Sequence, residues 1–569
     1  MTHNFYPNDF ASCFRIKVDM VVPELAVENN YKDWALAILN FKTLPDASQV
    51  SALESIDGHD RLFIKVFLHT SRLLCELGNL PIFDIPRVIS LSQDKQNAKK
   101  YILDVDFSSV LFVPQAAYQI PIKASLELCR WMAQSNPTSD NKIKVFNMIT
   151  ERVIKPLQRL VPSGKSTIPV LREAYYLGIP FCHLGAGVYQ LGWGSKAHRM
   201  NRSATELDSS IGAILTQNKA ITVNILRLAG LPAPNHFVVN TEAEAVSAAD
   251  RLGYKVVIKP TDLNGGAGVT VDVYNGAAVK LAFTHAHELS KSKQVLVERQ
   301  VAGICHRLFI ANGLLLYAVK RMPMSVRGNG RSTVIQLVED EVSAQKNKAP
   351  WNRSEIKPID ERALKALALA GFSPYSIPEE GVWVPLRQIE STADGGVDEE
   401  VTTTVHPENL SAAIAATKLF GLHIAGIDII TTDISKPWYE NGAVINEVNF
   451  APLFGGGEIS RSYIPKFFAH FMNGDGKIPI ETFDSEDEAI VRQREYCEKG
   501  LRCFFTSSAQ TIDFAGNLLN LPFANLRQRL QALIYRSDVD AITVYMPHRK
   551  AKSQVENLTA KQDYTVTVK

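Results

Sequence analysis

The stretch that decides the fold is VVIKPTDLNGGAGVTVDVY, residues 256–274. An apolar run ends in Lys259, three glycines follow within four residues, and apolar residues then alternate with polar ones. Alternation of this kind is typical of a half-buried strand. The sequence therefore predicts a strand over 254–259, a glycine-rich loop, and a second strand over 269–273.

The glycine-rich loop suits a phosphate group. Backbone N–H groups can approach phosphate oxygens where no Cβ intervenes, and Lys259 on the preceding strand adds a positive charge. Because a strand follows the loop, neither a helix N-terminus nor the dinucleotide fingerprint applies. Taken alone, the stretch fits a flexible turn beside a surface lysine equally well.

The composition is that of a globular protein. The chain has 569 residues, of which 21% are charged and 46% hydrophobic, enough for two to four domains. Its formal net charge is +2 and its charge runs are short, so neither nucleic acid nor membrane is an expected partner. No secretion signal or long apolar run is visible, and the seven cysteines are scattered without CxxC spacing. We therefore expect a cytoplasmic protein with reduced thiols.

Two further apolar segments carry isolated acidic or amide side chains. Asp428 lies in GIDII, residues 426–430, and Glu447 and Asn449 lie in AVINEVN, residues 443–449. Residues two apart on a strand share a face. Buried carboxylates are costly unless they are paired or bind a metal, and oxygen ligands suit Mg²⁺ held against nucleotide phosphates. A carboxylate paired with an arginine is the alternative.

Three other segments bear on a nucleotide site. QVLVERQV, residues 294–301, reads as a strand ending in a polar connector that could present backbone groups to an adenine edge. Asn312-Gly313 between two apolar runs predicts a hairpin. GKST, residues 164–167, imitates the end of a P-loop, but Arg159 stands where that motif needs its first glycine.

Composition also suggests where domains divide. A Pro/Gly/Ser patch at 161–168 and an acidic segment at 481–488, interpreted as a linker, bound the central region. We expect an N-terminal α/β domain over 1–160, a central domain over 161–480 with its glycine-loop subdomain at about 220–300, and a small C-terminal domain over 481–569.

Taken together, these segments resemble an ATP-grasp enzyme, and in particular the ATP-grasp half of cyanophycin synthetases. The likeness extends over roughly residues 110–475. The stretches that carry it are LGIP (177–180), QLGWG (190–194), KVVIKP (255–260), NGGAGV (264–269), VRGNGRST (326–333), VHPEN (405–409) and INEVN (445–449). GKST at 164–167 falls where that family has a similar segment, which removes the P-loop interpretation.

The resemblance implies an ATP-grasp fold of α/β (α+β) class, in which two α+β subdomains grip ATP. It also implies a carboxylate–amine ligase with ATP and Mg²⁺ as cofactors. ATP would phosphorylate a carboxylate, and an amine would then attack the acyl phosphate to give an amide, ADP and phosphate. By the same analogy the substrates are amino acids or small peptides, and the protein is a homo-oligomer.

The resemblance further assigns roles to residues. The phosphates would be held by Lys219 and Lys259 and covered by the loop residues Asn264, Gly265, Gly266 and Gly268. Adenine would be held by Glu298 and the backbone of Val301, and Mg²⁺ by Asp428, Glu447 and Asn449. Arg321 would steady the acyl phosphate, Arg307 matches a second family arginine, and Ser209 matches a serine near the carboxylate substrate. A turn or cap role for Ser209 is an equal alternative.

The hairpin sets a geometric condition on the two arginines. If Asn312-Gly313 is a two-residue turn, Arg307 pairs near Ala318, and Arg321 falls on the opposite face of the sheet. Both arginines then serve one site only if a bulge intervenes or the ligands reach both faces.

The sequence departs from the family in three places. Cys305 stands where an acidic residue usually meets the ribose, and Lys320 replaces a glutamate before Arg321, which could alter the substrate charge preference. The third departure is the absence of a Mur-ligase-like half, so we expect a single ligation. Alternatives within the class are glutathione-synthetase-like or dipeptide synthetases. Outside it, the alternatives are a non-catalytic ATP-grasp protein that binds nucleotide or a partner, and a kinase.

Overall fold

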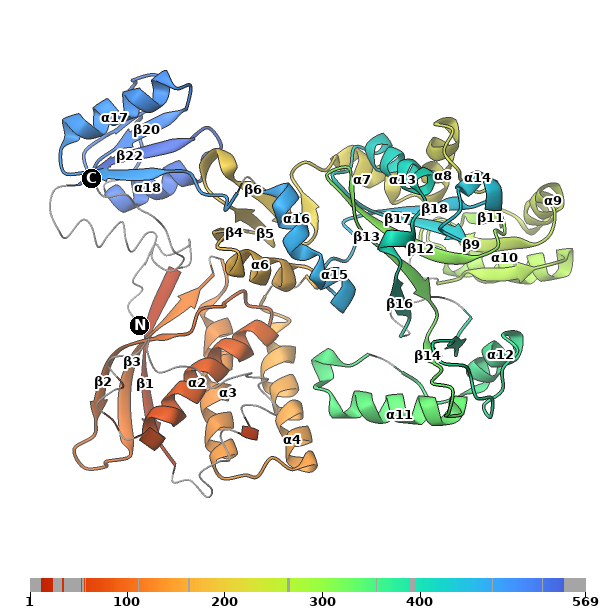
Figure 1. Ribbon diagram of the computed structural model, residues 1–569, viewed down its shortest axis with the longest axis horizontal. Helices are drawn as coiled ribbons and strands as arrows, with labels where there is room; N and C mark the ends of the chain where they lie inside the picture. The colour runs from red at the N-terminus through yellow and green to blue at the C-terminus, as the bar shows by residue number, and fades with distance from the viewer. Residues whose placement is uncertain are drawn as a thin grey trace. The chain divides into compact units, whose positions relative to one another are not determined.

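The structure is a computed structural model, drawn in Figure 1. It describes residues 12–23, 33–34, 53, 56, 58–110, 112–161, 164–263, 267–354, 356–388, 390, 395–472, 474–523 and 525–546. The chain packs as two compact units, one formed by residues 203–453 and the other by 1–202 together with 454–569. These limits differ from the boundaries at 160 and 480 that composition suggests.

The unit of residues 203–453 contains a four-stranded antiparallel sheet of order β10-β9-β11-β8. Its strands are β8 (His236–Val239), β9 (Val256–Pro260), β10 (Thr270–Val273) and β11 (Val295–Arg299). Helices α9 (Glu242–Leu252) and α10 (Gly276–Leu289) pack on one face through alanines and aliphatic residues. The strand–loop–strand predicted from the opening stretch is therefore confirmed. The loop residues Asn264, Gly265 and Gly266 lie outside the described residues.

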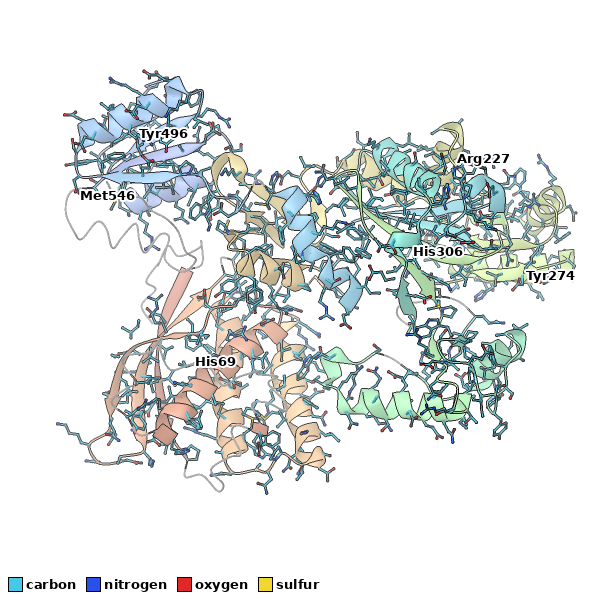
Figure 2. All side chains as sticks on the ribbon, in the orientation of Figure 1. His69, Arg227, Tyr274, His306, Tyr496 and Met546 are labelled. Carbon is cyan, nitrogen blue, oxygen red and sulfur yellow. The ribbon has the colours of Figure 1, made fainter. Side chains whose placement is uncertain are left out.

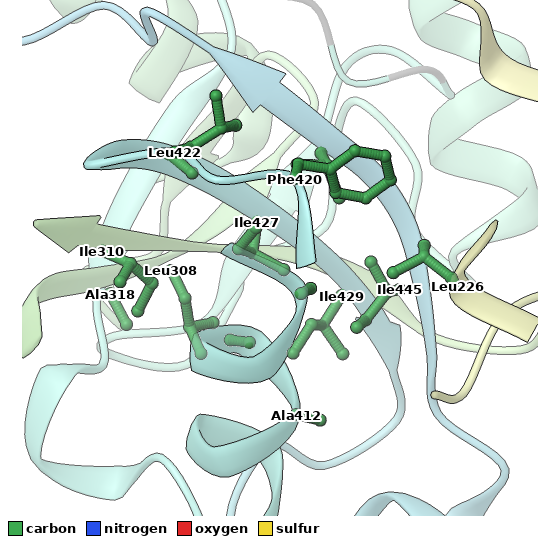
Figure 3. Packing of buried hydrophobic residues seen from close by; sticks show 14 of the residues in the cluster. Leu226, Leu308, Ile310, Ala318, Ala412, Phe420, Leu422, Ile427, Ile429 and Ile445 are labelled. Atoms are coloured by element: carbon green, nitrogen blue, oxygen red, sulfur yellow. The ribbon is translucent and has the colours of Figure 1, made fainter. Parts of the chain in front are cut away.

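A five-stranded antiparallel sheet of order β16-β13-β12-β17-β18 forms the second half of this unit. Its strands are β12 (Ile304–Ala311), β13 (Leu314–Met322), β16 (Val397–Glu400), β17 (Ile424–Thr431) and β18 (Val444–Phe450). Helices α8 (Lys219–Leu228) and α13 (Pro407–Leu419) cover one face, where Leu226, Leu308 and Ile427 pack together (Figure 3). The opposite face carries the polar residues singled out above.

Two bulges decide which side chains reach that polar face. In the β12–β13 hairpin Ile310 pairs with Leu315 but Phe309 pairs with Tyr317, so Leu316 is an extra residue. Between β17 and β18, Ile429 pairs with Ile445 but Asp428 pairs with Glu447, so Asn446 is extra. A bulge turns the residues beyond it to the other face.

A small insertion follows β13 in the chain. It consists of the antiparallel strand pair β14 (Ser325–Arg327) and β15 (Trp383–Pro385) with the helices α11 (Val334–Asn347) and α12 (Glu361–Leu369), which lie between the two strands in the chain. Its own core includes Val326, Val338, Leu367 and Val384. Two short helices complete the unit, α7 (Ser210–Thr216) before α8 and α14 (Trp438–Asn441) before β18.

The other unit begins with a three-stranded antiparallel sheet of order β1-β3-β2. The strands are β1 (Ser12–Val21), β2 (Arg87–Gln93) and β3 (Lys100–Ser109). Its longer described helices are α2 (Gly58–Leu77), α3 (Gln115–Ala133) and α4 (Ser139–Ile149), of which α2 and α3 pack together. A π-helical turn (Thr150–Ile154) and the short helix α5 (Lys155–Leu157) follow α4.

The same unit contains a second, smaller antiparallel sheet, with strands β4 (Phe181–Gly185), β5 (Val188–Leu191) and β6 (His198–Asn201). The short strand β7 (Ala204–Thr205) belongs to the unit of residues 203–453. Around the smaller sheet lie α6 (Thr167–Tyr176), α15 (Glu458–Ser462) and α16 (Ile464–Phe471). Trp193 and Cys182 join a core with Ile478 and Phe504 from the C-terminal segment.

The C-terminal segment folds into a four-stranded sheet of order β19-β22-β20-β21. The strands are Ile480–Phe483, Ala541–Tyr545, Cys503–Thr506 and Thr511–Ile512, with helices α17 (Glu486–Glu498) and α18 (Leu526–Ile534). The prediction of an acidic linker at 481–488 is therefore wrong. Glu481 lies in β19 and accepts from the Arg492 guanidinium, with Nε 2.7 Å from Oε2, and the next acidic residues open α17. Across the described part of the chain, no helix is long and apolar enough to cross a membrane.

Candidate active site

Arg307 and Asp428 form the centre of the polar face of the five-stranded sheet. They are direct neighbours on β12 and β17, and Arg307 donates from Nε to Oδ1 and from Nη2 to Oδ2 of Asp428, each at 2.7 Å. Asp428 is only 3% exposed. Burial alone would lower the pKa of Arg307, but the charge and hydrogen bonds of Asp428 outweigh it and raise that pKa. The pair is a bidentate, charge-assisted contact that fixes both side chains.

Arg321 lies on the same face of the sheet as Arg307, on the neighbouring strand β13. It pairs with Cys305 across the hairpin, its Nη1 lies 3.6 Å from Asp428 Oδ2, and its Nη2 lies 2.5 Å from Glu390 Oε1. Burial raises the pKa of Glu390, and Arg321 offsets that rise only in part. For both arginines to serve one site, the hairpin needed a bulge. The bulge at Leu316 provides it and brings Arg307 and Arg321 to one face of the sheet.

The predicted metal ligands meet on β17 and β18. Glu447 pairs with Asp428 across the two strands, and Asn449 shares the face of Glu447. Asn449 Nδ2 donates to Gly426 O at 3.2 Å and to Asp428 Oδ2 at 3.3 Å. Because the two heavy atoms of an amide diverge, the Asn449 Oδ1 acceptor points away from these partners.

Lys219 reaches this group from the start of α8. Asn218 caps the helix by accepting from Ile221 N, which fixes Lys219 at the first helical position. Lys219 Nζ donates to Glu447 Oε1 at 2.6 Å. Burial would raise the pKa of Glu447, but the nearby Lys219 charge and hydrogen bond hold it below its usual range.

Lys259 lies on β9 of the four-stranded sheet. Its side chain forms an ion pair on the face of that sheet that α9 and α10 do not cover. Its Nζ lies 3.1 Å from Glu298 Oε2, and both side chains are under a tenth exposed. The same Nζ lies 3.4 Å from Asn446 Oδ1 on β18. Consecutive residues Asn446 and Glu447 therefore contact the two lysines, so that cations from separate elements meet at one strand.

The donor set fits a hard divalent cation. Asp428 and Glu447 supply carboxylate oxygens and Asn449 an amide oxygen, all from one face of adjacent strands, and oxygen ligands are those that Mg²⁺ takes. The described residues hold no group of three His, Cys, Asp or Glu side chains close enough for a metal; this set has two carboxylates and an amide.

The two substitutions noted in the sequence fall on opposite faces. Cys305 lies on the site face beside Arg321, and burial together with the charges of Asp428 and Glu390 raises the pKa of its thiol well above the ordinary value. Lys320 pairs with His306, labelled in Figure 2, and its Nζ lies 3.6 Å from Glu399 Oε2. Strand alternation puts Lys320 on the face away from Arg321, so its charge does not enter the site directly.

Ser209 is the N-cap of α7. Its Oγ accepts from Gly212 N at 3.1 Å and its backbone N donates to Gly421 O at 2.9 Å. These contacts favour the cap alternative, while the substrate role of Ser209 stays a prediction. Of the glycine loop, Gly268 is described; it has φ +71°, and an added Cβ would lie 2.8 Å from Pro260 Cγ, so a glycine is required there. Val301 lies in the connector between β11 and β12.

Sequence reasoning missed two residues of the site. Asn446 was read only as part of a strand, and its contact with Lys259 depends on the bulge, which has no signal in the sequence. The second is Glu390, the ion-pair partner of Arg321. A buried arginine needs a counter-ion, which is the one signal that could have suggested an acidic partner.

A family model and several curated proteins match parts of the chain. Residues 218–307 match the family model of the carbamoyl-phosphate synthase L chain, ATP binding domain, a range that contains Lys219, Lys259, Glu298 and Arg307. The cyanophycin synthetase of Trichormus variabilis is 36% identical over 305 residues, 53% of this chain and 34% of that protein. That of Crocosphaera subtropica is 31% identical over 389 residues, 68% of this chain and 43% of that protein. The chain therefore contains an ATP-grasp domain similar to those of cyanophycin synthetases.

Two proteins named for glutathione synthesis also match the chain. The glutathione biosynthesis bifunctional protein GshAB of Mannheimia succiniciproducens is 30% identical over 264 residues, 44% of this chain and 34% of that protein. The crystal structure of a bifunctional glutathione synthetase from Pasteurella multocida aligns with 19% identity and a TM-score of 0.42, covering 74% of this chain and 62% of that one. The matches cover less than half of each of these curated relatives.

Proposed function

We propose that the protein is an ATP-dependent carboxylate–amine ligase that forms one amide bond, with ADP and phosphate as the other products. One observation carries this proposal: Asn446 and Glu447, adjacent on β18, contact Lys259 and Lys219, so that two cations meet one amide and one carboxylate at one strand. A triphosphate with its metal needs positive groups and oxygen ligands within a few ångströms of each other.

The chain's own residues would divide the reaction as follows. Lys219 and Lys259 hold phosphate oxygens, and Asp428, Glu447 and Asn449 hold Mg²⁺, which would neutralise charge that develops between the phosphates. Glu298 and the Val301 backbone bind adenine. Arg321 and Arg307 hold the substrate carboxylate as one of its oxygens attacks the γ-phosphorus and displaces ADP, which leaves an acyl phosphate. The amine then attacks the acyl carbon, loses a proton and expels phosphate.

The substrates are proposed as an amino acid or small peptide and a second amine. Support comes from the named relatives, one a synthetase of cyanophycin and another a protein of glutathione biosynthesis. We further propose a homo-oligomer in the cytoplasm, on the likeness of the chain to ligases of this type.

The proposal is tested by phosphate release from Mg-ATP across a panel of amino acids and dipeptides, with mass spectrometry of the products. We expect release to require two substrates and to yield a product lighter by one water than their sum. Glu447→Gln is the control that should abolish release. A phosphorylated product would instead identify a kinase, and tight ATP binding without turnover over the panel would identify a non-catalytic ATP-grasp protein.

A further inference from the structure

Both carboxylates of the proposed metal set are already held by basic side chains of the same site. Lys219 Nζ lies 2.6 Å from Glu447 Oε1, and the Arg307 guanidinium spans both oxygens of Asp428 at 2.7 Å. Lys219 and Glu447 are also partly shielded, with side-chain exposures of 17% and 28%. The contact between Lys219 and Glu447 therefore joins a proposed phosphate ligand directly to a proposed metal ligand.

We propose that Lys219 guards Glu447 against the metal, so that Mg²⁺ binds tightly only when the phosphates of ATP draw the lysine away. This inference rests on the proposed function. It gives Lys219 a second role besides neutralising phosphate, and it makes metal binding and nucleotide binding depend on each other.

The physical basis is competition for one oxygen. Mg²⁺ binds a carboxylate oxygen at about 2.0–2.1 Å, and an ammonium group 2.6 Å from that same oxygen would then face a divalent charge at close range. A metal that binds Oε1 must therefore displace Lys219, which loses its carboxylate partner in a partly buried setting.

The phosphates of ATP remove that penalty. When a phosphate oxygen replaces Glu447 as the partner of Lys219, the lysine keeps an anionic acceptor and Glu447 becomes open to the metal. Because coupling between two ligands is reciprocal, the metal must strengthen nucleotide binding by the same factor. Lys219 thus exchanges Glu447 for a phosphate oxygen in the same cooperative step in which Glu447 binds the metal.

Lys259 provides a matched contrast. It is also a proposed phosphate ligand, but its ion-pair partner is Glu298, which lies on β11 and is no member of the metal set. Removing Lys259 takes away a cation of the same kind without uncovering a metal ligand. A general electrostatic effect would act in both lysine variants, whereas a guarding effect acts only at Lys219.

The experiment titrates Mn²⁺ into the full chain and follows unbound Mn²⁺ by electron paramagnetic resonance, with and without a non-hydrolysable ATP analogue. We compare the wild type with Lys219→Met, with the matched lysine control Lys259→Met, and with Glu447→Gln. Circular dichroism checks that each variant is folded, and Lys219→Gln replaces Lys219→Met if the latter is not.

Without nucleotide, we expect Lys219→Met to bind Mn²⁺ roughly tenfold more tightly than the wild type, and Lys259→Met to match the wild type. With the analogue, the wild type should gain affinity for Mn²⁺ and Lys219→Met should gain much less.

Two results would overturn the inference, and they differ in what else they remove. If Lys219→Met binds Mn²⁺ no more tightly than the wild type while Glu447→Gln weakens Mn²⁺ binding with the analogue, the metal site stands and the guarding role is wrong. If Glu447→Gln has no effect on Mn²⁺ with or without the analogue, the assignment of the metal site fails, and the proposed function loses its main support.

Discussion

Arg307 and Arg321 lie on the same face of the five-stranded sheet because the hairpin that joins them contains one extra residue, Leu316. In a regular two-residue hairpin they would lie on opposite faces. With the bulge, both guanidinium groups lie next to Asp428, and Glu390 lies beside Arg321. The two guanidinium groups therefore lie on one side of the sheet, beside the same carboxylate.

Replacing Arg321 should damage chemistry more than nucleotide binding. If Arg321 holds the carboxylate and the acyl phosphate, Arg321→Met should lower kcat by roughly 100- to 1,000-fold, because a donor aimed at developing charge is lost. The dissociation constant for ATP should stay within about threefold of the wild type. Steady-state phosphate release and a nucleotide titration measure the two quantities.

Lys320→Met is the control for Arg321. Lys320 is the preceding residue, on the other face of β13, and pairs with Glu399 near the surface. Its replacement should change kcat by less than about twofold, since surface ion pairs contribute little. Equal losses in the two variants would mean that position on the face does not matter, against the present account.

Variants of the buried pair of Lys259 and Glu298 should affect the free energy of unfolding and the affinity for ATP differently. Lys259→Met leaves the Glu298 carboxylate buried without its cation and should lower the free energy of unfolding by about 3 kcal/mol. Adding Glu298→Gln should restore most of that loss but not the affinity for ATP. Urea denaturation and nucleotide titration of both variants check this; a double variant that binds ATP like the wild type would exclude a phosphate role for Lys259.

The Cys305 thiol should be unreactive at neutral pH. Its pKa is raised well above the ordinary value by burial and by Asp428 and Glu390, so the reactive thiolate is scarce at pH 7 and increases as pH rises toward that raised pKa. Alkylation at Cys305, followed by peptide mass spectrometry, should still be increasing at pH 9 and should slow further with Mg-ATP. A rate that levels off below pH 8 would show that the thiol is not shielded in this way.

Ser209 offers a test between its two roles. As the N-cap of α7, Ser209→Ala should lower the free energy of unfolding by about 1 kcal/mol, and Ser209→Asp should restore it because aspartate caps equally well. KM for both substrates should be unchanged in the aspartate variant. A raised KM for the carboxylate substrate in both variants would instead support the substrate role.

The sequence was most informative where side-chain pattern and backbone rule coincide. The strands that carry Lys259, Asp428 and Glu447 follow from apolar runs, and the hairpin follows from Asn312-Gly313. The shared face of Glu447 and Asn449 follows from a period of two. These inferences depend only on local geometry, which the residues themselves determine.

The parts that could not be predicted depend on contacts between distant segments. The bulges at Leu316 and Asn446 arise where two strands must keep aliphatic residues in one core while turning polar residues to the other face, and no local motif marks them. Likewise the segment at 481–488 has the acidic composition of a linker. It is part of a folded sheet and helix because Glu481 is neutralised by Arg492, which lies eleven residues further along the chain.

The central claim, that the carboxylate is activated by phosphorylation, is tested most directly by isotope transfer. The carboxylate substrate identified in the panel is labelled with ¹⁸O in its carboxyl group and turned over with unlabelled ATP and the amine, and the phosphate is analysed by mass spectrometry. An acyl phosphate predicts that each phosphate released carries one ¹⁸O atom, while ADP remains unlabelled. Unlabelled phosphate, or ¹⁸O in AMP, would contradict the account.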